Sequence, residues 1–192
     1  KSIKQEIKKY RSEVNIKYLQ RIFNNLYDFY DDEQYPFENL GILKETQLKF
    51  KYDPVEKAIF ITVESSANNR VPETKPKWFN MDWFTNLFFI PSKALKNSNP
   101  MRTYEDSLVK FYTHTGFTVS FKAIEGDLKK RLEEFIANNE VKNIYCYGWS
   151  LGGALVQLIH ESLVYRYNIK EDRNIQILSF TIGSPRVFYY AF

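Results

Sequence analysis

The part of the chain that most constrains its fold is residues 143–164, where a short apolar run, an abrupt turn and a longer apolar run follow one another. Residues 144–147 have the composition of a buried strand, and residues 151–163 repeat apolar side chains at helical spacing. Between them, Gly148 and Gly152 stand on either side of Ser150. A strand that turns so quickly into a helix brings backbone against backbone, which glycine allows. The segment therefore predicts a strand, a tight turn and a helix packed on that strand.

This pattern, Gly-x-Ser-x-Gly between a strand and a helix, is typical of a nucleophile elbow. A strained backbone would hold the hydroxyl of Ser150 clear of the sheet, and the following helix would point unpaired N–H groups toward developing negative charge. The short pattern also arises by chance, so the two flanking apolar runs carry this interpretation. The alternative is a tight structural turn without chemistry. We predict that Ser150 is the nucleophile and that Gly148 and Gly152 are the elbow glycines.

The composition limits the other classes of function. A chain of 192 residues suits one domain, and its net charge of +4 comes from lysines mixed with acidic residues, which indicates a solvated surface and no nucleic-acid partner. The single cysteine, Cys146, excludes an internal disulfide and a cysteine-based zinc site, and we expect a small core residue there. No apolar run is long enough to cross a membrane, and no signal-peptide pattern is visible. We expect neither metal nor cofactor, and the compartment stays open.

The order of predicted elements points to an α/β fold in one domain, residues 1–192. Residues 1–35 form an amphipathic helical segment, as one long helix or two joined near Ser12. A half-exposed strand at 46–52 and a buried strand at 58–63 flank a turn at Asp53 and Pro54. A strand at 108–112, a helix at 120–138, the elbow and a strand at 175–181 follow. This alternation predicts a mostly parallel sheet covered by helices.

The most aromatic segment, residues 78–89, follows a polar loop that contains Pro72 and Pro76. Such aromatic density usually belongs to a core. Its place after a long loop also allows a mobile apolar flap over a site or against a lipid surface. Both interpretations stay open.

Four segments in order resemble the class 3 lipases, the fungal-type triacylglycerol lipases of the α/β-hydrolase fold. In chain order they are Asp-Trp-Phe-Thr-Asn-Leu at 82–87, Thr-His-Thr-Gly-Phe at 113–117, Gly-Trp-Ser-Leu-Gly-Gly-Ala at 148–154 and Ser-Phe-Thr-Ile-Gly-Ser-Pro-Arg-Val at 179–187. Trp149 stands where the family's elbow usually has histidine. The resemblance implies an α/β-hydrolase-like domain and a serine carboxylic-ester hydrolase that acts on lipid esters through an acyl-enzyme.

The resemblance also implies roles for individual residues. Ser150 becomes the nucleophile, and the oxyanion hole is formed by Ser66 and by the backbone N–H of Leu151. Residues 67–90 correspond to a lid region. The implied partners are a lipid ester substrate and a transient lipid interface.

The catalytic triad of this fold follows the order serine, acid, histidine. In the family, the acid and the histidine come after the Gly-Ser-Pro-Arg-Val segment, and the histidines of this chain, His114 and His160, lie before it. We therefore expect the acid and the histidine downstream of Phe192, with this chain as the N-terminal, nucleophile-bearing portion of a domain truncated at its C-terminal end. The alternatives are a catalytically incomplete binding or structural module, and a membrane-surface protein that uses the basic N-terminal helix and the aromatic segment.

Overall fold

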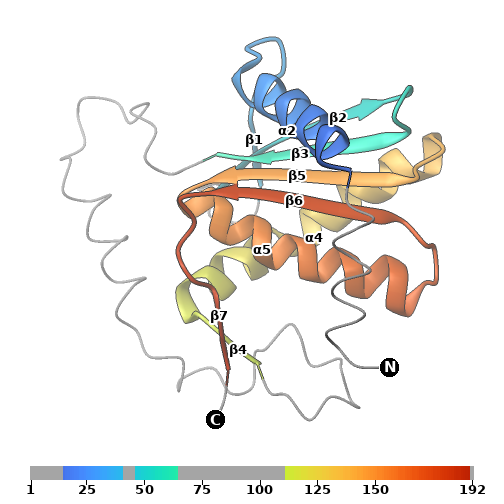
Figure 1. Ribbon diagram of the computed structural model, residues 1–192. Helices are drawn as coiled ribbons and strands as arrows, with labels where there is room; N and C mark the ends of the chain where they lie inside the picture. The colour runs from blue at the N-terminus through green and yellow to red at the C-terminus, as the bar shows by residue number, and fades with distance from the viewer. Residues whose placement is uncertain (1–14, 41–45, 65–110, 191–192) are drawn as a thin grey trace.

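The structure, a computed structural model, describes residues 15–40, 46–64 and 111–190 (Figure 1). A five-stranded sheet has the order β1-β2-β3-β5-β6, with helix α2 on one face and helices α4 and α5 on the other (Figure 1). The sheet strands are β1 (Glu38–Leu40), β2 (Thr46–Asp53), β3 (Ala58–Val63), β5 (Asn143–Trp149) and β6 (Gln176–Ile182). The helices are α2 (Ile16–Asp31), α4 (Thr115–Asn138) and α5 (Leu151–Leu163), which continues into the π-helical segment η2 (Val164–Lys170).

The pairing of the strands divides the sheet into two halves. β1, β2 and β3 pair antiparallel, whereas β3, β5 and β6 pair parallel. The helix-flanked α/β sheet predicted from the sequence is confirmed, but the described part is mixed rather than mostly parallel. The reason is local, because the short turn between β2 and β3 can join only antiparallel neighbours. The parallel half places the carboxyl ends of β3, β5 and β6 at the same edge, where Val63, Gly148 and Thr181 are in register.

The buried strand predicted at 58–63 is confirmed, with every residue of β3 buried. The prediction of a half-exposed strand at 46–52 is wrong for its centre, because Leu48, Lys49 and Phe50 are all buried. Leu48 and Phe50 pack in the core on the side of α4 and α5. Lys49, on the opposite face, lies under the end of α2, where its ammonium donates to the carbonyl oxygens of Tyr30 and Asp32 at 2.8 Å each. Both faces of the strand are therefore covered.

The described end of the strand predicted at 108–112, residues 111 and 112, does not join the main sheet. β4 (Phe111–Thr113) pairs antiparallel with β7 (Phe188–Tyr190) in a separate two-stranded sheet. The following helix, predicted from residue 120, begins at Thr115. Its first turns bury Phe117 and Phe121 in the main core, and this packing outweighs the weak helix propensity of the Thr, Gly and Val residues at 115–119.

The two faces of the sheet bury different side chains. The face toward α4 and α5 is mostly aliphatic and includes Cys146, which is fully buried as expected. The face toward α2 is aromatic, with Phe60, Tyr145 and Tyr147 under the helix. The buried side chains of α2 on this face are Ile22, Leu26 and Phe29.

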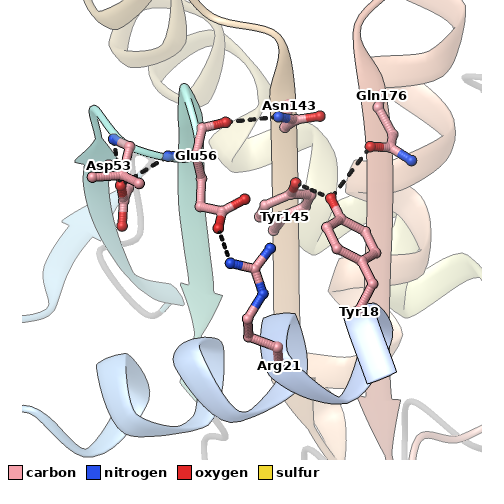
Figure 2. A network of polar contacts seen from close by, with 8 residues as sticks. Tyr18, Arg21, Asp53, Glu56, Asn143, Tyr145 and Gln176 are labelled. Atoms are coloured by element: carbon pink, nitrogen blue, oxygen red, sulfur yellow. Dashed lines mark hydrogen bonds and ion pairs between the residues drawn. The ribbon is translucent and has the colours of Figure 1, made fainter. Parts of the chain in front are cut away.

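Helix α2 lies within the predicted N-terminal helical segment. It begins at Ile16, because the Asn15 side chain accepts the backbone N–H of Tyr18 and so caps the helix. Figure 2 shows its attachment to the sheet, where the Tyr18 hydroxyl meets that of Tyr145 at 2.5 Å and Arg21 pairs with Glu56. Among the helices of the described ranges, none has the length and apolarity that a membrane crossing requires. The predicted lid at 67–90, the aromatic segment at 78–89 and Ser66 lie outside the described residues.

Candidate active site

A single residue separates the end of β5 at Trp149 from the start of α5 at Leu151. That residue, Ser150, has φ +50° and ψ −118°, a conformation that non-glycine residues rarely adopt. Two hydrogen bonds hold it: its N–H donates to the carbonyl oxygen of Ile182 at 2.8 Å, and its own carbonyl accepts the N–H of Ala154 at 3.2 Å. Backbone strain of this kind costs on the order of 1–3 kcal/mol and persists where the surroundings enforce it.

The surroundings of Ser150 are backbone packed directly on backbone. A Cβ on Gly148 would lie 2.5 Å from the carbonyl carbon and oxygen of Gly152, and a Cβ on Gly152 would lie 2.5 Å from the carbonyl oxygen of Val63. A Cβ on Gly153 would lie 2.8 Å from the Cβ of Ser184. The first turn of α5 therefore fits between the ends of β3, β5 and β6 only because these three positions carry no side chain.

The hydroxyl of Ser150 is not used to cap the helix that follows it. A serine at this position usually accepts an N–H from the first turn, but the side chain of Ser150 makes no such bond. The first N–H groups of α5, beginning with Leu151, have no partner within the helix and form its positive end. A half-buried hydroxyl thus stands beside backbone donors that suit an oxyanion.

The loop after β6 is fastened to the same helix. Gln157 of α5 donates through Nε2 to the Ser184 hydroxyl at 2.6 Å and lies 3.4 Å from the carbonyl oxygen of Pro185. Gly183, at the start of the loop, has φ +60°. Gln157 is not among the residues predicted for the site. Its signal was present, since it is a polar residue within the apolar run at 151–159.

Neither histidine bonds the hydroxyl of Ser150. His160 faces β6, where its Nδ1 lies 2.8 Å from the hydroxyl of Ser179, and burial lowers its pKa. Ten residues of α-helix place it roughly 15 Å along α5 from Ser150. His160 is therefore too far from the Ser150 hydroxyl to act as its base.

His114 precedes α4 and is buried. Its backbone N–H donates to the carbonyl oxygen of Val187 at 2.9 Å, and its ring packs on Phe117 with 4.8 Å between ring centroids. Both ring nitrogens lack a hydrogen-bond partner in the part of the chain that the structure describes, and burial lowers the pKa of the imidazole. In those ranges no group of His, Cys, Asp and Glu side chains is arranged to hold a metal ion.

A known protein family matches the part of the chain that contains this strand, turn and helix. The sequence model of the family described as "Lipase (class 3)" matches residues 79–192, well over half of the chain. The chain belongs to the class 3 lipase family. The resemblance drawn from the four ordered segments is thereby confirmed. No curated protein sequence matches the chain.

Solved lipases share the fold of this class 3 lipase chain. The triacylglyceride lipase of Rhizomucor miehei is 20% identical, with a TM-score of 0.52 over 80% of this chain and 48% of its own. The lipase of Rhizopus microsporus var. chinensis is 19% identical, with a TM-score of 0.52 over 78% of this chain and 44% of its own. Lipase II of Rhizopus niveus is 18% identical, with a TM-score of 0.53 over 78% and 47%. These matches confirm the α/β-hydrolase fold, and the chain spans less than half the length of each solved lipase.

Proposed function

We propose that this chain carries the nucleophile of a serine ester hydrolase that acts on lipid esters, as triacylglycerol lipases do, and that Ser150 is that nucleophile. The observation that carries the proposal is the backbone of Ser150, held at positive φ between β5 and α5 with a hydroxyl that does not cap the helix. Membership of the class 3 lipase family supports the substrate class. One structurally similar protein is a triacylglycerol lipase whose catalytic centre is a serine protease triad.

The proposed reaction is acyl transfer through Ser150. Its oxygen attacks the ester carbonyl carbon as the proton passes to a general base, and the carbonyl becomes a tetrahedral oxyanion. The carbonyl re-forms as the alcohol leaves with a proton from that base, and water then releases the acid from the acyl-enzyme by the same two steps. The N–H of Leu151, at the positive end of α5, is proposed to hold the oxyanion. Loss of one such donor typically slows acyl transfer by about 10²–10³-fold.

Three parts of this proposal concern groups other than Ser150 and Leu151. Ser66 as the second oxyanion donor and residues 67–90 as a lid that opens at a lipid interface both lie outside the described residues and stay predictions. The general base is not assigned to this chain, because His160 bonds Ser179 and His114 is buried beside Phe117. The expectation of an acid and a histidine downstream of Phe192 also stays a prediction.

A fluorophosphonate probe, which bonds covalently to activated serines, tests the proposal on the full-length protein. We expect labelling in the wild type and its loss in Ser150→Ala. The matched control is Ser179→Ala, because Ser179 is also paired with a histidine, at 2.8 Å, yet lies on β6 away from the elbow. We expect Ser179→Ala to be labelled at the wild-type rate.

Two results would contradict the proposal. Labelling that survives Ser150→Ala and disappears in Ser179→Ala would move the nucleophile to β6. A full-length wild type that is not labelled at all would favour the alternative of a hydrolase fold kept as a binding or structural module.

A further inference from the structure

A large apolar side chain lies exposed next to the proposed nucleophile. Trp149, the residue before Ser150, is 49% exposed. The other large exposed apolar side chains of the described ranges belong to other elements, namely α2, the β2–β3 turn, α4 and η2, and none is next to Ser150 in the chain; they are Ile16, Tyr27, Val55, Val119 and Ile169. Of these side chains, Trp149 is therefore the one placed to meet a substrate bound at Ser150.

The position of Trp149 in β5 fixes the direction of its side chain. Successive residues of a strand face opposite sides of the sheet. Gly148 faces α5, so Trp149 faces the side of α2, as Tyr147 does. Its partner across the sheet is Ile182, which packs against the same aromatic cluster under α2. Trp149 thus lies at the edge of that cluster nearest to the elbow.

The indole of Trp149 also lies against the loop that follows β6. Its Nε1 is 3.8 Å from the point where a Cβ on Gly183 would be, which is ordinary van der Waals distance. The backbone beneath the indole is fixed, because the N–H of Ser150 is bonded to Ile182 at 2.8 Å. The ring is therefore held on the β6 side of Ser150, whereas Gly152 fills the β3 side against Val63.

We propose that Trp149 is a specificity-determining residue whose indole face binds the apolar chain of the ester beside Ser150. This inference rests on the proposed function. A fixed aromatic ring offers a large apolar area with little loss of side-chain freedom on binding. The longer the apolar chain that lies on the indole, the more apolar surface leaves water, so Trp149 favours esters with long chains over short ones.

The test measures how fast p-nitrophenyl alkylphosphonates react with Ser150 in the full-length protein, with a methyl or an octyl group on phosphorus. The ratio of the octyl to the methyl rate constant reports binding of the chain. We expect Trp149→Ala to lower this ratio roughly 10-fold and Trp149→Phe to keep most of it, since a smaller aromatic ring remains. Because the side chain is half exposed, unfolding midpoints should stay within about 3 °C of the wild type.

Val119→Ala is the matched control, because Val119 on α4 is also 49% exposed, and it should leave the ratio unchanged. A second series keeps p-nitrophenolate as the leaving group and carries the alkyl chain on the alkoxy group that stays on phosphorus; it shows which side of the ester meets the indole, and a response of Trp149→Ala in either series supports the inference. If all variants react at Ser150 with the wild-type ratios in both series, the inference about Trp149 is overturned and the proposed function stands. If the wild type itself does not react at Ser150, both are overturned.

Discussion

Two regions of this molecule are built on the same strand, β5, in opposite ways. At its carboxyl end, the turn at Ser150, which is the predicted elbow, brings Gly148, Gly152 and Val63 into backbone contacts that leave no room for a Cβ. On its α2 side, Tyr145 meets the helix through its hydroxyl, which bonds that of Tyr18, and Tyr147 meets it through its ring, which packs on rings of α2. The elbow is thus defined by missing side chains, whereas the α2 side is defined by large ones.

The difference teaches how each region should respond to change. On the α2 side the contacts are several and adjustable: the Tyr18 hydroxyl reaches both Tyr145 and Gln176, and Arg21 pairs separately with Glu56 (Figure 2). Arg21 is more than half exposed, so its ion pair contributes little by itself. At the elbow, main chain packs directly on main chain, and no flexible side chain can adjust to an added Cβ. We therefore expect substitutions at the elbow to destabilise the protein more than substitutions on the α2 side.

The largest effect should come from one methyl group at the elbow. Gly152→Ala places a Cβ 2.5 Å from the carbonyl oxygen of Val63, so either the first turn of α5 or the end of β3 must move. We expect a loss of about 3 kcal/mol or more in the free energy of unfolding, measured by urea denaturation. The control is Gly126→Ala in α4, where nothing lies within 4 Å, and a gain of about 0.5–1 kcal/mol is expected. Equal stability of the two variants would break the comparison.

A smaller loss should follow from Lys49→Met on the α2 side. Lys49 is 4% exposed and donates to two carbonyl oxygens at the end of α2, so its removal leaves both without that donor. We expect a loss of about 2 kcal/mol in the free energy of unfolding by urea. Lys51→Met is the control, since Lys51 is only half-buried and its ammonium lies 5.4 Å from the ring centroid of Tyr35. A change no larger than that of Lys51→Met would show that the buried lysine does not hold α2.

The contact between Tyr18 and Tyr145 should matter less. Tyr145→Phe keeps the ring and removes one hydroxyl, while Tyr18 keeps Gln176 within 3.5 Å. We expect a loss of about 1 kcal/mol, and a double-mutant cycle with Tyr18→Phe should return a coupling of similar size. Tyr52→Phe, which removes an exposed bond to the carbonyl oxygen of Glu140, should cost less. A loss above that of Gly152→Ala would reverse the ranking of the two regions.

The smallest effect is on the pH dependence of stability. It concerns His160 of α5, on the face of the sheet opposite to α2. Burial lowers the pKa of His160 below its ordinary value of 6.5. Between 6.5 and that lower value the unfolded chain binds more protons, so stability is complete above pH 6.5 and falls as the pH drops toward the folded pKa. We expect His160→Gln to reduce the loss between pH 7.5 and pH 5.5 by under about 1 kcal/mol. The rest of the loss should remain, because burial also lowers the pKa of His114. Urea unfolding at the two pH values checks this, and an unchanged difference would exclude His160 as a source.

How far the sequence predicted the fold depends on where the signal lies. Strand β3 was predicted with its observed bounds, because a continuous apolar run is a local property of the chain. The start of α4 was missed by five residues, because the burial of Phe117 and Phe121, and not local propensity, forms its first turns. The burial of Lys49 was missed for a related reason, since its partners are the main-chain carbonyls at the end of another element.

The candidate site divides in the same way. The sequence by itself determined the strand, the turn and the helix around Ser150, because glycines and apolar runs within residues 143–164 specify them. The tertiary structure alone decided that Gln157 fastens the loop at Ser184 and that the indole of Trp149 lies against Gly183. Those contacts join β5 and α5 to the end of β6, which the chain reaches some 30 residues later. Local pattern sets what an element is, and only the packing of distant elements sets what its side chains meet.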